Sequence, residues 1–498
     1  MRTCVTRGSL RKRKLKLQSL LSQVLKENRL YWLYGGCLVF IVLNLMMMVQ
    51  GVYWLSAMPV ALGVMLMLFF SLDKLILLLV FLTPFSFKYV HEELGFAMTL
   101  PTEPVIVVIM LLFVVRLIYE GNYDKRVLRH PLTVFLIIQL LWMLVTTITS
   151  EMPLVSFKFF ISRFWFVTTF FFIGVYLFRE RKNMHRFMWL FGSALAVVVM
   201  MATYKHYLHG FEREVGYAMV QPFFNDHTHY GAVLALVAPF FIVMAFNRSG
   251  SVLRRRLAVM VFLLFCAGIL FSFSRASWLS LIVAAGGFVI LVFRLKFRFI
   301  LAGLILLLGI FALFQTEIVM QLERNQQESS GDFSEHVQSI TNITSDASNL
   351  ERINRWRSAY RMYEERPVFG WGPGTYQFVY APFQRAEDYT IITTHFGDLG
   401  NAHSEYIGPL SESGLPGMLF FIGLVLALMA TGVKLYKQAP DREMRLIALG
   451  LTLGFITYLT HGLLNNFLDT DKASVPFWGM MAILVAMDVF YPKREQRT

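Results

Sequence analysis

Residues 257–293 read LAVMVFLLFCAGILFSFSRASWLSLIVAAGGFVILVF. Two apolar runs, 257–273 and 277–293, flank a short polar turn that contains Arg275. Each run is long enough for a membrane-spanning helix, which needs about 17–25 mostly apolar residues. The stretch therefore predicts two adjacent spans joined by a tight turn.

Runs of this kind recur through the 498-residue chain, of which 56% is hydrophobic and only 16% is charged. Soluble domains carry about 25% charged residues, so the composition excludes a soluble enzyme, a disordered chain and a disulfide-stapled secreted domain. We predict an all-α polytopic membrane protein with about 12–14 transmembrane helices. The fourteen candidate spans lie near 31–50, 52–70, 75–90, 104–119, 132–149, 159–178, 187–205, 228–247, 257–273, 277–293, 299–315, 415–433, 445–463 and 474–491.

The distribution of basic residues predicts the orientation. A cytoplasmic N-terminus places 32 of the 46 Lys and Arg residues in the segments on the inner side, which is the bias that membrane insertion favours. Both termini are then cytoplasmic. The net charge of +14 becomes a topology signal, and we expect the basic tail to contact anionic lipid and not nucleic acid.

This topology divides the chain into five parts. They are a cytoplasmic tail at 1–30, spans one to eleven at 31–315, a large periplasmic loop at 316–412, spans twelve to fourteen at 413–491, and a second cytoplasmic tail at 492–498. A loop as long as 316–412 is usually functional.

The large loop has an unusual composition and its own predicted structure. It contains seven arginines and no lysine, and arginine suits bidentate binding of phosphate or carboxylate. Ser348–Glu351 resembles a capping box, and Pro367 ends the helix that it would begin. An aromatic face along this helix could lie at the membrane interface. The glycine-rich stretch Phe369–Thr375 lacks the lysine of a phosphate loop, so a tight turn is the better interpretation.

The segment His403–Gly417 reads HSEYIGPLSESGLPG and precedes the twelfth predicted span. It places an imidazole and two carboxylates, Glu405 and Glu412, near the outer membrane boundary. Histidine can accept a proton near neutral pH, so His403 suits a general base that acts on a sugar hydroxyl. An isolated interfacial histidine is more often structural, and the surrounding pattern decides between the two.

That pattern resembles the His-[Asn/Ser/Gln]-x9-Gly-x-x-Gly motif of the bacterial O-antigen ligase family. Three further segments are similar to landmarks of the family in the same chain order. They are the Ser-Arg-Ala-Ser-Trp sequence within Phe273–Trp278, the stretch Arg366–Gly374 after the loop helix, and, more loosely, Phe224–Gly231. The resemblance covers roughly residues 215–420.

The resemblance implies a GT-C-like membrane fold in the bacterial inner membrane with its active site on the periplasmic side. It also implies a reaction in which a glycan linked to undecaprenyl diphosphate is transferred to an acceptor hydroxyl. The acceptor is lipid A–core in ligases, a growing glycan in polymerases and a protein hydroxyl in related transferases. The motif does not separate these acceptors. We take ligation to lipid A–core as the first expectation and a polymerase of O-antigen or exopolysaccharide as the alternative. No cofactor is expected, because the lipid diphosphate is itself the leaving group.

The implied roles follow from charge. His403 would deprotonate or align the acceptor hydroxyl, and Glu405 would orient the imidazole. Guanidinium groups stabilise a departing diphosphate, and the candidates are Arg275, Arg163 at the outer end of the sixth span, and Arg352 on the loop helix. Arg163 could instead extend to the membrane interface. The candidates for lining the polar cavity are Asp226, His227 and Glu412.

Other signals are weaker. Histidines at 206, 209, 227 and 229 could bind zinc, but no cysteine joins them, so we expect no metal. Asp469-Thr-Asp471 resembles the DxD of sugar-nucleotide transferases, yet a solvated outer loop is the preferred interpretation. A transporter of lipid-linked oligosaccharide is the alternative from another class. Polar residues gather at the outer ends of spans, which favours a fixed one-sided site over alternating access.

Overall fold

The computed structural model describes residues 31–91, 96–295, 298, 309, 347–389, 393 and 400–491. The chain divides into two compact units, Met1–Leu75 and Ile76–Thr498. Within the described part of the first unit are the helix Tyr31–Val49, the 3-10 turn η1 (Trp54–Ala57) and α2 (Met58–Phe70). The following helix, α3 (Leu72–Leu82), crosses the boundary between the units.

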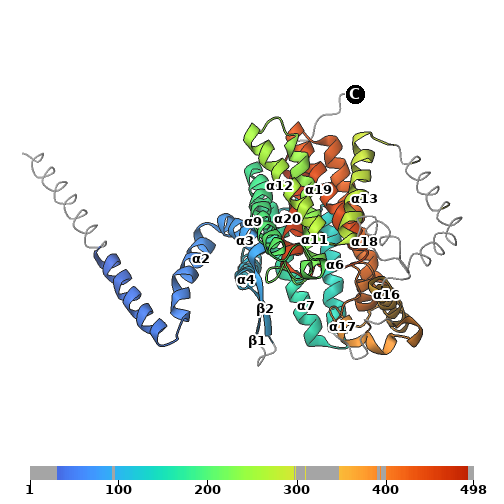
Figure 1. Cartoon of the computed structure of the whole chain (residues 1–498), viewed down its shortest axis with the longest axis horizontal. Helices are drawn as coiled ribbons and strands as arrows, with labels where there is room; N and C mark the ends of the chain where they lie inside the picture. Colours follow the sequence, from blue (N-terminus) through green and yellow to red (C-terminus); the bar gives the residue numbers. More distant parts are fainter. Residues whose placement is uncertain are drawn as a thin grey trace, which may run out of the picture. The chain divides into compact units, whose positions relative to one another are not determined.

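The second unit holds the remaining elements (Figure 1). In chain order these are η2 (Thr83–Phe85), β1 (Phe87–His91), β2 (Phe96–Leu100), α4 (Thr102–Glu120), α5 (Lys125–Leu128), α6 (Pro131–Ile148), α7 (Pro153–Phe166), the π-helix η3 (Val167–Ile173), α8 (Gly174–Leu177), α9 (Arg181–Leu208), α10 (Arg213–Gly216), α11 (His227–Ala245), α12 (Val252–Phe271), α13 (Arg275–Val292), α16 (Ala347–Glu365), α17 (Tyr376–Val379), η5 (Ala381–Phe383), η6 (Ala386–Asp388), α18 (Ile407–Gln438), α19 (Arg442–His461) and α20 (Asp471–Phe490).

The described helices confirm a predominantly helical, multi-pass membrane protein. Ten of them are long and apolar enough to cross a membrane, and α7, η3 and α8 together form one of these spans. The predicted span 257–273 is helical as part of α12, which begins earlier, at Val252, and carries arginines at 254–256 in its first two turns. The predicted span 299–315 lies outside the described residues apart from Gly309.

The predicted span at 75–90 is wrong. The helix α3 ends at Leu82, and Pro84 lies in the short turn η2 that follows. Proline has no backbone N–H to continue a helical ladder. The chain then forms the antiparallel hairpin of β1 and β2, in which Lys88 pairs with Thr99.

Three helices, α11, α19 and α20, form the buried centre of the second unit, because most of each span is enclosed by other helices. Small residues allow α11 and α19 to approach closely. A Cβ added to Gly454 would lie 2.3 Å from the Leu236 carbonyl oxygen, and one added to Gly450 would lie 2.9 Å from the Phe240 Cα. The Thr457 hydroxyl crosses the same interface and donates to the Ala235 carbonyl at 2.9 Å.

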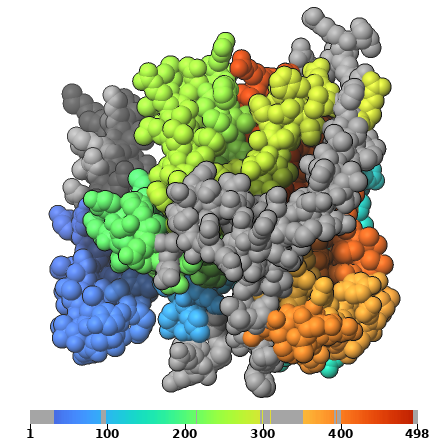
Figure 2. All heavy atoms as spheres, turned by 45° about the vertical axis from the view of Figure 1, so that its right-hand side comes forward, coloured from blue at the N-terminus to red at the C-terminus, as the bar shows by residue number. Residues whose placement is uncertain are grey.

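Consecutive spans run in opposite directions, so their turns gather at two ends of this unit. The turns before α7, α11, α13, α18 and α20 contact one another at one end. The turns before α6, α9 and α19 lie at the other end. There His130, before α6, pairs with Asp488 near the end of α20, and Arg181, at the start of α9, pairs with Asp441, before α19. In Figure 2 the orange surface of α16 and α17 lies toward the lower end, and the yellow-green surface of α12 and α13 lies toward the upper end. The first end carries the predicted site residues.

Candidate active site

His403 lies in the turn that precedes α18, in a conformation that few residues adopt. Its φ is 49°, in the left-handed region, and its backbone N–H donates to the Asn401 side-chain oxygen at 3.0 Å. A strained backbone at a polar site is a reason to suspect function. Burial, then the positive charges of Arg355 and Arg352, lower the pKa of His403 to about 4, against an opposing hydrogen bond to Asn465. The imidazole is therefore neutral at pH 7.

Glu405 has different partners from the imidazole that we expected. One of its carboxylate oxygens accepts from the backbone N–H groups of Phe467 and Leu468 at 2.8 and 3.0 Å, and from the Tyr458 hydroxyl at 2.7 Å. Its own N–H donates to the Gly462 carbonyl at 2.8 Å. Glu405 thus fastens the α19–α20 turn to the start of α18. The imidazole is instead hydrogen-bonded to the side chain of Asn465, on that same turn.

A polar cavity of about 70 Å³ lies next to this turn. Residues from separate stretches of sequence line it, and the charged ones are Arg163, Glu405, Glu412 and Asp469. Ser404, Asn401 and Asn466 add neutral polar groups. Burial and the nearby Glu405 carboxylate raise the pKa of Asp469 to about 6, against the opposing charge of Arg163. The cavity therefore concentrates charge of both signs in a small volume.

Arg163 reaches this cavity from α7, which begins at Pro153, earlier than predicted. The residue consequently lies in the third turn of the helix and not at the start of the span. Its guanidinium lies over the rings of Phe159 and Trp478, with the guanidinium carbon 5.8 and 5.7 Å from the ring centroids. The Nε atom is buried and has no hydrogen-bond partner among the residues that the structure describes. A buried donor without a partner costs free energy unless a ligand supplies an acceptor.

The glycine-rich turn that follows α16 packs directly against the start of α18. The N–H groups of Trp371 and Gly372 donate to the carbonyls of Ser411 and Glu412 at 3.1 and 2.8 Å, and Leu415 N–H donates to the Pro367 carbonyl at 2.9 Å. The Glu412 carboxylate accepts from Tyr376 N–H at 3.2 Å. The turn is therefore one half of an interlocked junction, which confirms the tight turn and joins two of the motifs noted in the sequence.

The α16 helix places two arginines near His403. Arg352 donates from Nε to the Leu464 carbonyl at 3.3 Å, which ties α16 to the α19–α20 turn. Arg355 pairs with Glu351 at 2.9 Å and lies over the Tyr380 ring at 5.1 Å. Both lower the pKa of His403, so both act on it electrostatically. Arg355 was not among the residues predicted from the sequence, because its helical face offered no distinguishing pattern.

Arg275 and Asp226 mark a neighbouring polar region. Arg275 is the first residue of α13 and does not line the cavity of Arg163. Asp226 caps the start of α11 by accepting from His229 N–H at 2.7 Å, and its charge acts on His403. His227 donates from Nδ1 to the Ser272 carbonyl at 2.8 Å, which joins the starts of α11 and α13. The motif segments Phe224–Gly231 and Phe273–Trp278 therefore lie side by side.

The aspartate pair at 469 and 471 has more structure than the predicted solvated loop. Asp471 is only 4% exposed and pairs with Lys472, whereas Asp469 is accessible from the cavity. The sequence signals for Asp469 are its DxD-like pairing with Asp471 and its place just before the last span, and neither predicts a residue that lines the cavity of Arg163. Asn465 carries no signal. Among the residues whose placement is described, no group of three or more His, Cys, Asp or Glu side chains is arranged to hold a metal ion.

The fold and this site together define a class: a multi-pass membrane protein with a polar cavity lined by one arginine and three carboxylates. At the same end of its helices, beside the cavity, a turn carries a neutral histidine on which two further arginines act. The comparison with protein families agrees. Residues 258–422, about a third of the chain, match the family model described as O-Antigen ligase. This segment is therefore similar to the O-antigen ligase family, as the motifs predicted, and the similarity supports a membrane glycosyltransferase of the O-antigen ligase and polymerase type. A search of curated proteins found no match to the chain.

Proposed function

We propose that the protein transfers a glycan from undecaprenyl diphosphate to an acceptor hydroxyl, and that it ligates O-antigen to lipid A–core at the periplasmic face of the bacterial inner membrane. The observation that carries the proposal is the cavity in which the Nε of Arg163 is buried without a partner among the described residues, beside the turn of His403. A cation with an unsatisfied donor suits a diphosphate, and a neutral imidazole suits a hydroxyl.

His403 acts on the acceptor hydroxyl in this proposal. The acceptor oxygen forms a bond to the anomeric carbon of the glycan, and the bond from that carbon to the diphosphate oxygen breaks. The imidazole takes the proton of the acceptor hydroxyl, either during or after bond formation. Asn465 holds the imidazole, while Glu405 holds the turn on which Asn465 lies. Glu405 is thus a positioning residue in this proposal.

The arginines bind the donor in this proposal. The leaving undecaprenyl diphosphate gains negative charge, and preorganised guanidinium groups stabilise that charge. Arg163 is the first candidate because of its place in the cavity, and Arg352 is the second because it acts on His403. Arg275 remains a candidate through its family motif. A bound diphosphate would offset the charges that lower the pKa of His403, so donor binding should make the imidazole a stronger base.

The decisive experiment uses the full-length protein in lipid vesicles with lipid-linked O-antigen and lipid A–core. We expect His403→Ala to reduce transfer by at least about 100-fold, the lower range for loss of a general base. His209→Ala is the matched control, because His209 is exposed and its imidazole bonds to the Lys205 carbonyl of its own helix. Near-normal transfer by the His403→Ala protein would overturn the assignment.

The products of the same assay identify the acceptor. Polymer attached to lipid A–core supports ligation. Longer lipid-linked chains without attachment to core would show a polymerase. Movement of lipid-linked glycan across the vesicle membrane without any new glycosidic bond would show a transporter. The second and third outcomes both reject the ligase proposal.

A further inference from the structure

A second polar cavity, of about 210 Å³, lies on the other side of Asp469 from the first. Three segments far apart in the sequence form it: the β-hairpin with the start of α4, the stretch before α11, and the start of α20. Its polar lining includes Lys88, Glu103, Asn225, Asp469, Thr470 and Lys472. Asp469 also lines the first cavity, and none of the other residues has a role in the transfer step proposed above.

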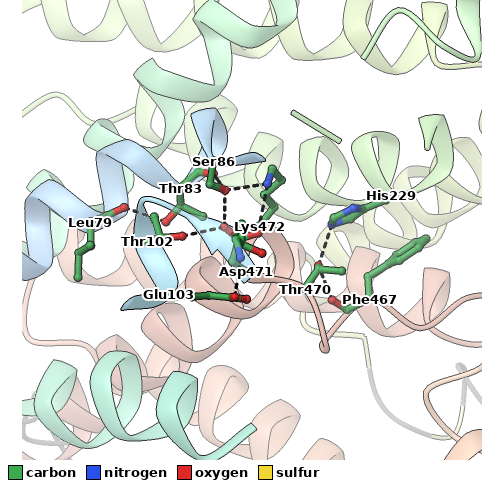
Figure 3. Close-up of polar contacts among 11 residues, drawn as sticks. Leu79, Thr83, Ser86, Thr102, Glu103, His229, Phe467, Thr470, Asp471 and Lys472 are labelled. Carbon is green, nitrogen blue, oxygen red and sulfur yellow. Dashed lines mark hydrogen bonds and ion pairs between the residues drawn. The ribbon is translucent and has the colours of Figure 1, made fainter. Parts of the chain in front are cut away.

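A hydrogen-bonded network makes the wall of this cavity rigid (Figure 3). Lys472 and Asp471 are 5% and 4% exposed and form an ion pair at 3.2 Å. Lys472 also donates to the Ser86 hydroxyl at 2.8 Å, and that hydroxyl contacts the Asp471 carboxylate. Thr102 donates to the same carboxylate at 3.3 Å. The start of α20 is thereby joined to the segments on either side of the β-hairpin, and the cavity is preformed.

The opposite wall is equally fixed. His229 donates from Nε2 to the Thr470 hydroxyl at 2.9 Å, and that hydroxyl donates to the Phe467 carbonyl at 2.7 Å (Figure 3). The His229 ring also stacks on the Phe467 ring, with centroids 4.8 Å apart. Phe467 in turn donates its N–H to Glu405. The second cavity and the candidate active site therefore share one framework.

The groups that face this cavity include both hydrogen-bond donors and hydrogen-bond acceptors. Lys88 and Asn225 have exposed side chains, whereas Glu103 is partly buried and accepts from Thr99 N–H at 2.6 Å through one of its oxygens. Ammonium groups donate, carboxylates accept and an amide does both. The hydroxyls of a sugar also donate and accept, so they match such a lining. An anion fits less well, because it would face the carboxylates of Glu103, Asp469 and Asp471.

The two cavities meet at Asp469. This residue lines both, and the charges of Arg163 on one side and Lys88 on the other act on its carboxylate. A chain of sugars with its reacting end beside Arg163 would have its next rings near Asp469, where the second cavity lies. We propose that this second cavity is a carbohydrate subsite, which binds a sugar ring of one of the two glycan substrates. The inference rests on the proposed function.

Two variants test the subsite without disturbing the buried network. Asn225→Trp fills the cavity from an exposed position, and Lys88→Ala removes a donor. Lys74→Ala, an exposed lysine outside the cavity, is the matched control for Lys88→Ala. In the vesicle assay we expect each cavity variant to raise KM for one substrate by about 3- to 10-fold, the value of one or two lost hydrogen bonds. The kcat value should stay within about 2-fold.

The substrate whose KM rises identifies the source of the sugar. A change in KM for lipid-linked glycan places the donor in the subsite, and a change for lipid A–core places the acceptor there. Both outcomes support a carbohydrate subsite. Unchanged KM values for both substrates in the Asn225→Trp protein would overturn it, provided that the variant is monodisperse and retains wild-type helicity.

A binding measurement separates failure of the subsite from failure of the proposed function. The probes are free oligosaccharides released by mild acid from lipid-linked glycan and from lipopolysaccharide, titrated calorimetrically into the nanodisc-embedded protein. We expect binding to the wild type and to His403→Ala, and at least about 5-fold weaker binding to Asn225→Trp. If the wild type transfers no glycan but shows this pattern, the subsite stands and the ligase proposal falls. Equal binding by the wild type and Asn225→Trp, or none by the wild type, overturns the subsite.

Discussion

At the scale of the residue, the charge state of His403 decides what the site can do. Arg355 and Arg352 lie close enough to oppose a positive charge on the imidazole, and burial opposes it further. The neutral ring is ready to accept a proton but has a weak affinity for one in the free protein. Under the proposed function, an arriving diphosphate would raise the pKa of this imidazole, which would couple donor binding to activation of the acceptor.

The pH dependence of transfer should show this coupling. Because protonated His403 cannot accept a proton, activity falls as the pH decreases through its pKa. For kcat/KM, which reports the free protein, we expect that limb near pH 4, well below the ordinary value of 6.5. For kcat, which reports the complex with donor, the limb should lie at higher pH. Coincident limbs in the two profiles would contradict the coupling.

Ionisation of Asp469 should produce a second change in the pH profile, which must be distinguished from the limb due to His403. Its pKa of about 6, raised by burial and by Glu405, predicts a change in activity at a pH above the His403 limb. The Asp469→Asn protein should lose this upper change and keep the lower one. Profiles of kcat/KM for the wild type and this variant, recorded from below the His403 limb to above the Asp469 limb, measure both effects.

At the scale of the element, the junction between the glycine-rich turn and α18 holds the site together. The helix α18 continues past Gly414, although the φ of this residue, 68°, is not helical, so α18 is kinked there. The Gly414 backbone lies so close to the turn that an added Cβ would be 2.1 Å from the Val368 carbonyl oxygen. Only glycine avoids both the strain and the clash.

Gly414→Ala should therefore loosen this junction. We expect a loss of about 1–3 kcal/mol in the free energy of unfolding, the usual cost of a strained backbone residue, and slower transfer because His403 loses its support. Gly286→Ala is the matched control, since a Cβ at Gly286 meets nothing within 4 Å. Thermal unfolding in detergent measures the difference, and equal Tm values for the two variants would contradict the explanation.

The elements that could be predicted from the sequence are those with a local signal. Apolar runs located the long spans, and the glycines of 369–375 indicated a turn. Ser348 and Pro367 indicated the helix α16, although it begins one residue before the predicted cap, at Ala347. The run at 75–90 failed because apolar periodicity does not distinguish a short helix followed by a hairpin from a continuous span. Pro84 was the local signal that opposed the span.

A candidate site residue could be proposed from the sequence where one motif contained it, as for His403. It was not predictable where residues from distant segments meet. Arg163 joins Asp469 and Glu405 only because α7, the α19–α20 turn and the start of α18 share one end of the unit. Asn465 replaced Glu405 as the partner of the imidazole for the same reason: neighbours in sequence pointed to Glu405, whereas the packing of α19 against α18 supplied Asn465.

At the scale of the whole molecule, the two ends of the second unit differ in chemistry. One end holds the cavity, α16 and the β-hairpin. The other holds ion pairs such as Arg181 with Asp441 and Lys434 with Asp488. The distribution of basic residues predicts that the second end is cytoplasmic, and we therefore propose that the cavity faces the periplasm.

Cysteine labelling tests this orientation. With Cys4, Cys37 and Cys266 replaced by serine, Tyr360→Cys on α16 and Lys437→Cys near the end of α18 provide exposed sites at the two ends. A membrane-impermeant maleimide applied to spheroplasts should label Tyr360→Cys, and it should label Lys437→Cys only after permeabilisation. The reverse pattern would place the site in the cytoplasm and exclude the periplasmic proposal.

The cavity is lined by segments that are far apart in the sequence, so it can form only late in the synthesis of the chain. Arg163 leaves the ribosome roughly 300 residues before Asp469, which at about 5–20 residues per second is a delay of some tens of seconds. During that interval the growing chain has an arginine but no cavity, because α18 and the turn before α20 are still missing. Under the proposed function, glycan transfer can therefore start only after the last helix has entered the membrane.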